Sequence, residues 1–266
     1  MQKKRYSLED FIEIMKTLRG PNGCPWDREQ SHESLKKSFI EETYEVLEAI
    51  DLKRPDKLCE ELGDVLLQVV FHAIIAEEEG HFTIHDVIDG VSKKMVHRHE
   101  HVFGKGHAET ADDVIDLWDK VKKKEKGAGT QTEILKDIPS ILPALIRSYK
   151  VQEKAAKVGF DWDDVKDAWK KVEEEKDELQ QAYESMDMQK TEEELGDLLF
   201  AIVNVSRFLK IEPELALTKT INKFIKRFEY IETKSSENGK QLTDMTLEEM
   251  DVLWDEAKVI FKGERE

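Results

Sequence analysis

The chain has 266 residues and a formal net charge of −17 at pH 7, with 39% hydrophobic and 37% charged residues. The charged share exceeds the roughly 25% of an ordinary soluble protein, but enough apolar residues remain to build hydrophobic cores. Such an acidic chain lacks the basic surface that non-specific binding to nucleic acid or to anionic membranes needs, so we expect neither partner. A small polyanionic ligand is still compatible, provided that local cations neutralise it.

The cysteine content and the apolar runs point to a soluble, cytoplasmic protein. Cys24 and Cys59 are too few for a disulfide framework. The first residues are polar and basic, with no apolar signal segment behind them. The most apolar run, residues 65–76, is shorter than the roughly 20 residues that cross a membrane.

Helix-favouring residues dominate the sequence, which predicts an all-α fold. One set of helices is expected near residues 7–19, 34–52, 56–79, 83–103 and 111–126. A second set is expected near residues 141–158, 163–186, 190–210, 213–236 and 246–262. Small polar residues with two glycines form the predicted linker at 127–132, which would separate a domain over 1–126 from one over 133–266.

The two sets of helices repeat each other, which indicates an internal duplication. EETYE at 41–45 returns as EEKDE at 174–178, and EELGDVLL at 60–67 returns as EELGDLLF at 193–200, both 133 positions later. Further matches follow in the same order at offsets of 129 to 136, pairing Lys94 and Arg98 with Lys223 and Arg227, Trp118 and Lys122 with Trp254 and Lys258, and Trp26 with Trp162. Each half is therefore predicted to be a helical domain.

Acidic residues recur on predicted helix faces that otherwise carry apolar side chains. Glu42 falls between Phe39 and Val46 at helical spacing, with Glu45 one turn further on. In the next helix Glu61 and Asp64 share the apolar face in the same way, and the second half repeats the pattern around Glu175 and Asp197.

Packing these faces together would place four carboxylates of each half close to one another. Like charges at a shared point need a cation, and all-oxygen ligands suit Mg²⁺, with Mn²⁺ as a substitute. The alternative, ordinary solvated acids, fits the run Glu77 to Glu79 well but fits acids on apolar faces badly. The pattern therefore favours a metal site in each half.

Basic and aromatic residues at helical spacing could hold phosphates. Lys223 and Arg227 are spaced i, i+4, as are Trp254 and Lys258, so they offer phosphate donors and a flat aromatic surface. For each pair alone, a solvated helix face or a core tryptophan is the simpler interpretation, but both pairs recur in the two halves. A zinc site at His97 and His101 is disfavoured, because the second half keeps no histidine there.

At these residues the sequence resembles the MazG family of all-α nucleoside triphosphate pyrophosphohydrolases, a group that includes dimeric dUTPases and dCTP pyrophosphatases. Besides the duplicated acidic motifs, the resemblance rests on GCPWDREQSH at 23–32, PAL at 143–145 and KAAKVGFDW at 154–162. It covers nearly the whole chain. It implies two tandem helical-bundle domains, a homodimer, and Mg²⁺-dependent cleavage of NTPs or dNTPs to NMP and pyrophosphate, as in sanitation of the nucleotide pool.

The resemblance also implies roles for single residues. The metal ligands would be Glu175, Glu178, Glu194 and Asp197, with Glu42, Glu45, Glu61 and Asp64 as first-half equivalents. The nucleotide contacts would be Lys223, Arg227, Trp254 and Lys258, with Lys94, Arg98, Trp118 and Lys122 as first-half equivalents. Glu174 or Glu175 is the candidate base for the attacking water; the sequence does not separate base from ligand.

One position predicts that the second half carries most of the NTP hydrolysis. Asn204 lies two helical turns after Asp197 and corresponds to Phe71 at the offset of 133. An amide can hydrogen-bond a nucleobase edge and a phenyl ring cannot, although Asn204 could also be a satisfied polar core residue. The rival to an enzyme is a non-catalytic acidic helical module that regulates or binds a partner protein, and release of pyrophosphate from NTPs would discriminate the two.

Overall fold

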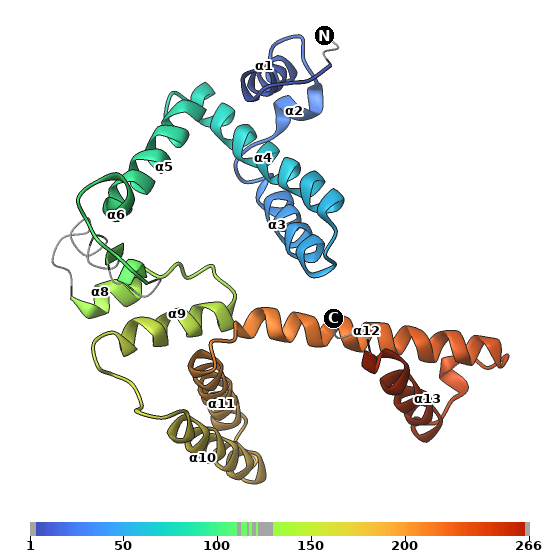
Figure 1. Cartoon of the computed structure of the whole chain (residues 1–266). Coiled ribbons are helices and arrows are strands. Elements are labelled where there is room, and N and C mark those ends of the chain that lie inside the picture. The colour runs from blue at the N-terminus through green and yellow to red at the C-terminus, as the bar shows by residue number, and fades with distance from the viewer. Residues whose placement is uncertain (1–3, 111–112, 116, 119–120, 122–129, 264–266) are drawn as a thin grey trace. The chain divides into compact units, whose positions relative to one another are not determined.

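The computed structural model describes residues 4–110, 113–115, 117–118, 121 and 130–263, and all regular structure in these ranges is helical. This confirms the all-α prediction for the described residues. The chain divides into two compact units, Met1–Glu125 and Lys126–Glu266 (Figure 1). In the helices that the structure describes, none combines the length and apolar character needed to cross a membrane.

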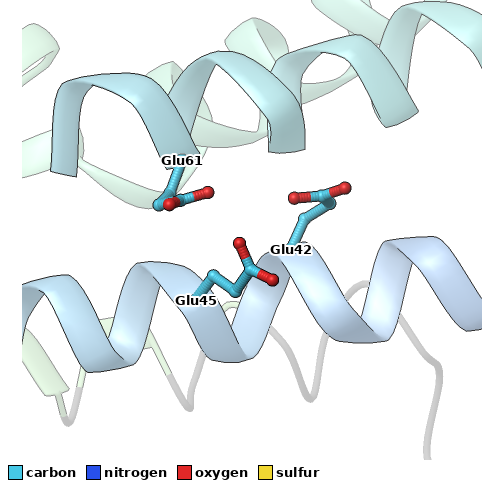
Figure 2. Close-up of side chains that lie close together, drawn as sticks. All are labelled: Glu42, Glu45 and Glu61. Atoms are coloured by element: carbon cyan, nitrogen blue, oxygen red, sulfur yellow. The ribbon is translucent and has the colours of Figure 1, made fainter. Parts of the chain in front are cut away.

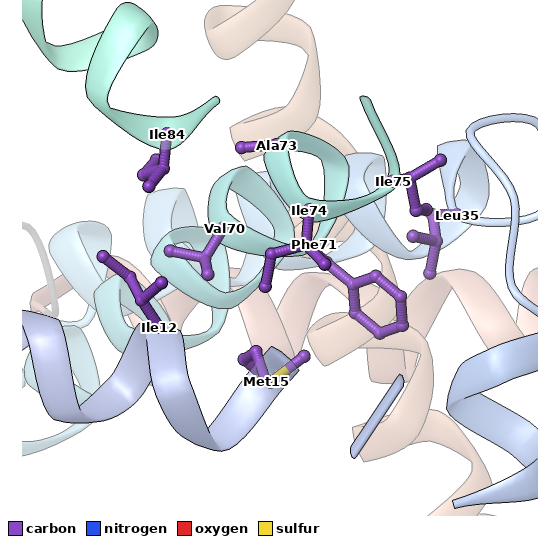
Figure 3. Packing of buried hydrophobic residues seen from close by; sticks show 9 residues of the cluster. All are labelled: Ile12, Met15, Leu35, Val70, Phe71, Ala73, Ile74, Ile75 and Ile84. Carbon is purple, nitrogen blue, oxygen red and sulfur yellow. The ribbon is translucent and has the colours of Figure 1, made fainter. Parts of the chain in front are cut away.

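The first unit is built around a helical hairpin. Its helices are α1 (Leu8–Arg19), α2 (Pro25–Glu29), α3 (Lys36–Asp51), α4 (Pro55–Glu78), α5 (Ile84–Arg98) and α6 (Glu100–Phe103). α3 packs along α4, while α1 and α5 contact the C-terminal part of α4 through one apolar cluster (Figure 3). That cluster contains Ile12, Met15, Leu35, Val70, Phe71, Ala73, Ile74, Ile75 and Ile84. The core therefore lies at one end of α4 and leaves the other end for polar residues.

The second unit repeats the hairpin and extends it. Its helices are α8 (Gln131–Lys136), α9 (Ala144–Ala156), α10 (Val165–Glu184), α11 (Met188–Phe208), α12 (Pro213–Glu237), α13 (Leu247–Ile260) and the short 3₁₀ helices η1 (Leu242–Asp244) and η2 (Phe261–Gly263). α10 and α11 make the most extensive helix pair, α9 packs on α11, and α13 folds back on α12 (Figure 1).

The duplication extends to the turns. Three residues join α3 to α4 and three join α10 to α11. Each turn contains a non-glycine residue in the left-handed region, Lys53 with φ 52° and Met186 with φ 57°, and these residues lie 133 positions apart. The same backbone geometry at equivalent positions sets the same register between the two helices of each hairpin, which decides where their acidic residues meet.

Three expectations about secondary structure were wrong. The helix expected over 83–103 is interrupted at His99, whose φ of −111° and ψ of 47° separate α5 from α6. The short helices α2 and α8 were not predicted, although a capping box of Thr130 and Glu133 starts α8. Residues 130–132 therefore begin a helix instead of completing the predicted linker over 127–132. Most of the helix expected over 111–126 lies outside the described residues.

A histidine pair joins the segment before α3 to α4. The Nδ1 atoms of His32 and His72 are 2.7 Å apart, and the rings stack with an interplanar angle of 4°. Burial lowers the pKa of His72, and the neighbouring His32 lowers it further. His32 also lies beside Glu79, with 3.7 Å between its Nε2 and the carboxylate.

We expect this pair to make the folded state less stable in mild acid. The unfolded chain binds a proton at His72 with a pKa of about 6.5, whereas the folded chain resists it, so stability is lost as the pH falls from 7.5 to 5.5. His72→Phe should flatten this dependence, measured by urea unfolding at several pH values. The exposed His81→Phe is the control, and an unchanged slope in His72→Phe would contradict the expectation.

Candidate metal centre and adjoining cavity

Each hairpin gathers carboxylates at one point. In the first, Glu42 and Glu45 of α3 and Glu61 of α4 each place one oxygen within 4.8 Å of the others (Figure 2). In the second, Glu175 of α10 does the same with Glu194 and Asp197 of α11. Residues three apart lie one above the other on a helix, so two acids from one helix meet the facing acid of its partner.

The fourth predicted acid of each group lies near its cluster but outside the closest three. Burial raises the pKa of Glu42, and the charges of Asp64 and Glu45 raise it further. In the second half burial raises the pKa of Glu178, with contributions from Glu175 and Glu194. These shifts show that the charges of each group act on one another, as expected for acids that share one point without a cation.

A lysine partly neutralises each cluster. In the first half, Lys57 Nζ lies 2.6 Å from Glu61, which lowers the pKa of the Glu61 carboxyl, while Glu45, hydrogen-bonded to Glu61, has a raised pKa. In the second half, Lys171 Nζ lies 2.6 Å from Glu175 Oε1 and 2.8 Å from Glu174 Oε1. Hydrogen bonds to these two acids raise the pKa of Lys171, so it stays charged.

The second cluster fits a hard divalent cation. Glu175 is only 5% exposed, and its Oε2 atom is buried with no hydrogen-bond partner. A buried, unpaired carboxylate oxygen is costly, and a cation bound beside it would remove that cost. Carboxylate oxygens from Glu175, Glu194 and Asp197, with Glu178 nearby, are the donors that Mg²⁺ and Mn²⁺ take.

A cavity of about 660 Å³ adjoins the second cluster. Lys171, Glu175 and Asp197 line it, so it reaches the carboxylates. The other residues along its wall come from α8, α9, α11 and the segment before α10, and they include Gln152, Phe160, Asp161, Trp162, Asn204 and Arg207. Charged groups, aromatic rings and amides thus share one cavity of a size typical for small-molecule ligands.

The equivalent positions of the first half are packed. Asn204 and Arg207 correspond to Phe71 and Ile74 at the offset of 133, and these are 3% and 2% exposed within the apolar cluster around Met15 (Figure 3). The same stretch of helix therefore contributes polar groups to a cavity wall in one half and hydrophobic contacts to a core in the other. The two hairpins share their acids but not what lies next to them.

The predicted phosphate-binding residues lie elsewhere. Lys223 and Arg227 are on α12, and Trp254 and Lys258 are on α13; none of the four lines the cavity. The guanidinium of Arg227 stacks on Trp254 at 5.4 Å, and Lys258 pairs with Asp255 at 2.8 Å. These residues therefore form a group of their own, on helices that pack mainly against each other and α9.

Their first-half counterparts are only partly described. Lys94 and Arg98 lie in the last turns of α5, and the ring of Trp118 meets His99 edge-on, with 5.0 Å between the centroids. Lys122 lies outside the described residues.

The sequence analysis missed several residues of the cavity wall. Lys171 precedes Glu175 by one helical turn, so its spacing could have indicated it. Phe160 and Trp162 stand in the segment that carried the family resemblance, but no role followed from it. Arg207 follows Asn204 by three residues, so helical spacing could have indicated that contact, but its bond to Asp161 is distant along the chain. Gln152 left no sequence signal, because its partner Phe200 is also distant along the chain.

Comparison with known proteins identifies the family. A model described as the MazG nucleotide pyrophosphohydrolase domain matches residues 30–103 and 164–231, which hold the two helical hairpins with their carboxylate clusters. The chain belongs to the MazG family. The two matched segments agree with the duplication and with the resemblance found in the sequence.

Three relatives extend the match over nearly the whole chain. The nucleoside triphosphate pyrophosphohydrolase/pyrophosphatase MazG of Thermotoga maritima is 46% identical over 97% of this chain and 98% of that protein. The nucleoside triphosphate pyrophosphohydrolase of Escherichia coli strain K12 is 43% identical over 94% of this chain and 97% of that protein. The uncharacterized protein YabN of Bacillus subtilis is 53% identical over 95% of this chain, and the match spans 52% of that protein.

We expect metal ions to stabilise the folded chain through the second cluster. Mg²⁺ or Mn²⁺ should raise the melting temperature, because a ligand that binds only the folded state at about 100 times its Kd contributes about 2.7 kcal/mol. Glu194→Gln with Asp197→Asn should remove much of this shift and should also raise the stability without metal, since it relieves repulsion.

Thermal melts with and without each ion would measure both effects. Glu192→Gln with Glu193→Gln, two exposed acids on the same helix, is the matched control. If the double variant without metal were as unstable as a core truncation such as Val203→Ala, the acids would have a structural role and the metal assignment would be wrong.

Proposed function

We propose that the protein hydrolyses NTPs and dNTPs to NMP and pyrophosphate with Mg²⁺ as its cofactor, and that the second-half cluster and cavity form the active site. One observation carries the proposal: the acids Glu175 and Asp197 open directly into a nucleotide-sized cavity that also contains Lys171. The full-length relatives named as nucleoside triphosphate pyrophosphohydrolases support the same reaction.

The proposed metal ligands are Glu175, Glu178, Glu194 and Asp197. A bound divalent cation would supply charge neutralisation to the phosphate oxygens. Lys171, held at the edge of the cluster by two acids, would donate further hydrogen bonds to the same phosphates. Lys171 would thus add positive charge beside the carboxylates, which a triphosphate needs in an acidic protein.

Burial separates the two candidate bases. Glu175 is almost fully buried among the cluster acids, which suits a metal ligand. Glu174 is exposed, and its carboxylate lies 2.8 Å from Lys171 at the rim of the cluster, where water has access. We therefore assign to Glu174 the removal of a proton from the attacking water, and to Glu175 the role of ligand.

We infer that the active form is a homodimer. Large apolar side chains are exposed along both hairpins and along α12. On α12 they recur at helical spacing as Leu217, Ile221, Phe224, Ile225 and Phe228, and on the first hairpin they include Phe39, Ile40, Leu62 and Leu66. A contiguous apolar helix face is costly in water and typical of an interface, so a second copy of the chain would cover these faces.

The same dimer would complete the active site. Lys223, Arg227, Trp254 and Lys258 lie on α12 and α13 and do not line the cavity of their own chain. We propose that these residues reach the nucleotide on the partner's carboxylate cluster. The first-half residues Lys94, Arg98, Trp118 and Lys122 would play the equivalent part for the first cluster.

A complementation experiment tests the shared site. Glu175→Ala and Arg227→Ala should each be inactive alone, but co-expressed they should recover about a quarter of the wild-type activity, since half of the dimers would then hold one intact site. Light scattering should give twice the mass of the chain. A monomer, or a co-expressed pair as inactive as either variant, would contradict the proposal.

The reaction and its location can be tested together. Incubation with each canonical NTP and dNTP and Mg²⁺ should release pyrophosphate and not orthophosphate. Glu175→Ala or Glu178→Ala should abolish most of this activity, whereas Glu42→Ala or Glu45→Ala should leave most of it, because the first half offers Phe71 where the second offers Asn204.

The first-half variants are the matched controls, since they remove the same acid from the equivalent helix. Equal losses in both halves would overturn the ranking of the two clusters. If the folded wild type released no pyrophosphate from any nucleotide, the rival function, a non-catalytic acidic module that binds a partner protein, would stand instead.

A further inference from the structure

Two amide side chains line the cavity, and each is held by hydrogen bonds through one end of its amide group. Asn204 Oδ1 accepts hydrogen bonds from Arg207 Nε at 3.1 Å and from Arg207 Nη2 at 2.9 Å. Gln152 Nε2 donates to the backbone carbonyl of Phe200 at 2.8 Å. Gln152 is only 7% exposed, and its Oε1 atom is buried with no hydrogen-bond partner.

These bonds decide which way each amide faces. A guanidinium has only donors, so turning Asn204 over would set its NH₂ group against the N–H groups of Arg207. A carbonyl has only acceptors, so turning Gln152 over would set its oxygen against the oxygen of Phe200. The cavity therefore receives a donor from Asn204 and an acceptor from Gln152, and neither can exchange its role at low cost.

Arg207 is itself held in place. Its Nη2 also donates to Asp161 Oδ1, its guanidinium stacks on Phe208 at 4.6 Å, and its side chain is 13% exposed. The same Asp161 oxygen accepts the backbone N–H of Trp162 at 2.9 Å. One network thus sets both the amide of Asn204 and the start of the segment that brings the Trp162 ring to the cavity wall.

The first half has none of these groups. Asn204 and Arg207 correspond to Phe71 and Ile74, and Asp161 corresponds to Pro25 at the offset of the two tryptophans. All three polar members of the network are replaced by apolar residues, and two of these are in the first-half core. The network therefore distinguishes the cavity of the second half from the packed equivalent positions of the first half, as expected for groups that select a ligand.

We propose that Arg207 is a positioning residue that, with Asp161, orients Asn204 so that Asn204 and Gln152 read a nucleobase edge on which an acceptor and a ring N–H stand side by side. Such an edge is present in guanine, hypoxanthine, uracil and thymine. The inference deepens the proposed function and rests on it for the identity of the substrate. The base would lie against Trp162, while the phosphates extend toward Lys171 and the carboxylates.

Nucleosides provide a probe that needs neither the metal nor the reaction. Guanosine and uridine should bind the full-length protein in calorimetry without metal, and 1-methylguanosine and 3-methyluridine, which lack the ring N–H, should bind about tenfold more weakly or worse. Equal binding of methylated and unmethylated nucleosides would overturn the reading of this edge.

Two variants distinguish a positioning role of Arg207 from a purely structural one. Arg207→Lys keeps the positive charge but loses the pair of hydrogen bonds to Asn204 Oδ1. Asn204→Asp keeps the shape of the side chain and the contact with Arg207, but it removes the N–H donor. Both should weaken nucleoside binding about tenfold and raise the KM of the NTP by a similar factor, with kcat and inhibition by inorganic pyrophosphate unchanged. Arg147→Lys, at an exposed position of α9, is the control.

The outcomes are distinguishable from failure of the proposed function. If both variants bound nucleosides as the wild type does, or if inhibition by pyrophosphate weakened equally, Arg207 would have no positioning role. Nucleoside binding that responds to Arg207→Lys in a protein that releases no pyrophosphate would refute the proposed reaction and leave this inference standing.

Discussion

The repulsion among carboxylates on two packed helices is the constraint on which the rest of this protein depends. Each hairpin places acids from both of its helices within a few ångströms, and burial strengthens their repulsion because it removes the water that would screen them. Lys57 and Lys171 each relieve part of it with one short ion pair. The remaining repulsion would be relieved by a divalent cation, which could at the same time bind the phosphate oxygens of a nucleotide.

Because of the duplication, both halves contain such an acidic cluster. The residues beside the cluster differ between the two halves. In the first, Phe71 and Ile74 join α1 and α4 into the apolar core. In the second, Asn204 and Arg207 at the same positions are polar, so α9 and α11 enclose a cavity that reaches the acids. The same helix face thus belongs to a packed interior in one half and to a cavity wall in the other, while the hairpin and its turn are alike in both.

The match to the MazG family model agrees with this distinction between the shared hairpins and the divergent residues beside them. The family match falls on the two hairpins, which carry the shared acids, whereas the network of Arg207, Asn204 and Asp161 involves positions at which the halves differ. The shared acids would serve the metal chemistry that we propose, and the divergent wall would serve selection of the base in the second half.

The sequence by itself determined the all-α class, the duplication and the acids that meet, because helical spacing is local and a repeated motif repeats its geometry. It could not show that α5 ends at Arg98, since the break at His99 is a single backbone conformation within a helix-favouring run. It placed Phe39 on an apolar helix face but could not tell that this side chain stays exposed. The cavity, the distance of Lys223 and Arg227 from it, and the orientation of Asn204 were decided only by tertiary structure. Each depends on which elements pack against one another. The contact of Gln152 with Phe200 spans 48 positions and that of Arg207 with Asp161 spans 46, beyond the reach of any local pattern.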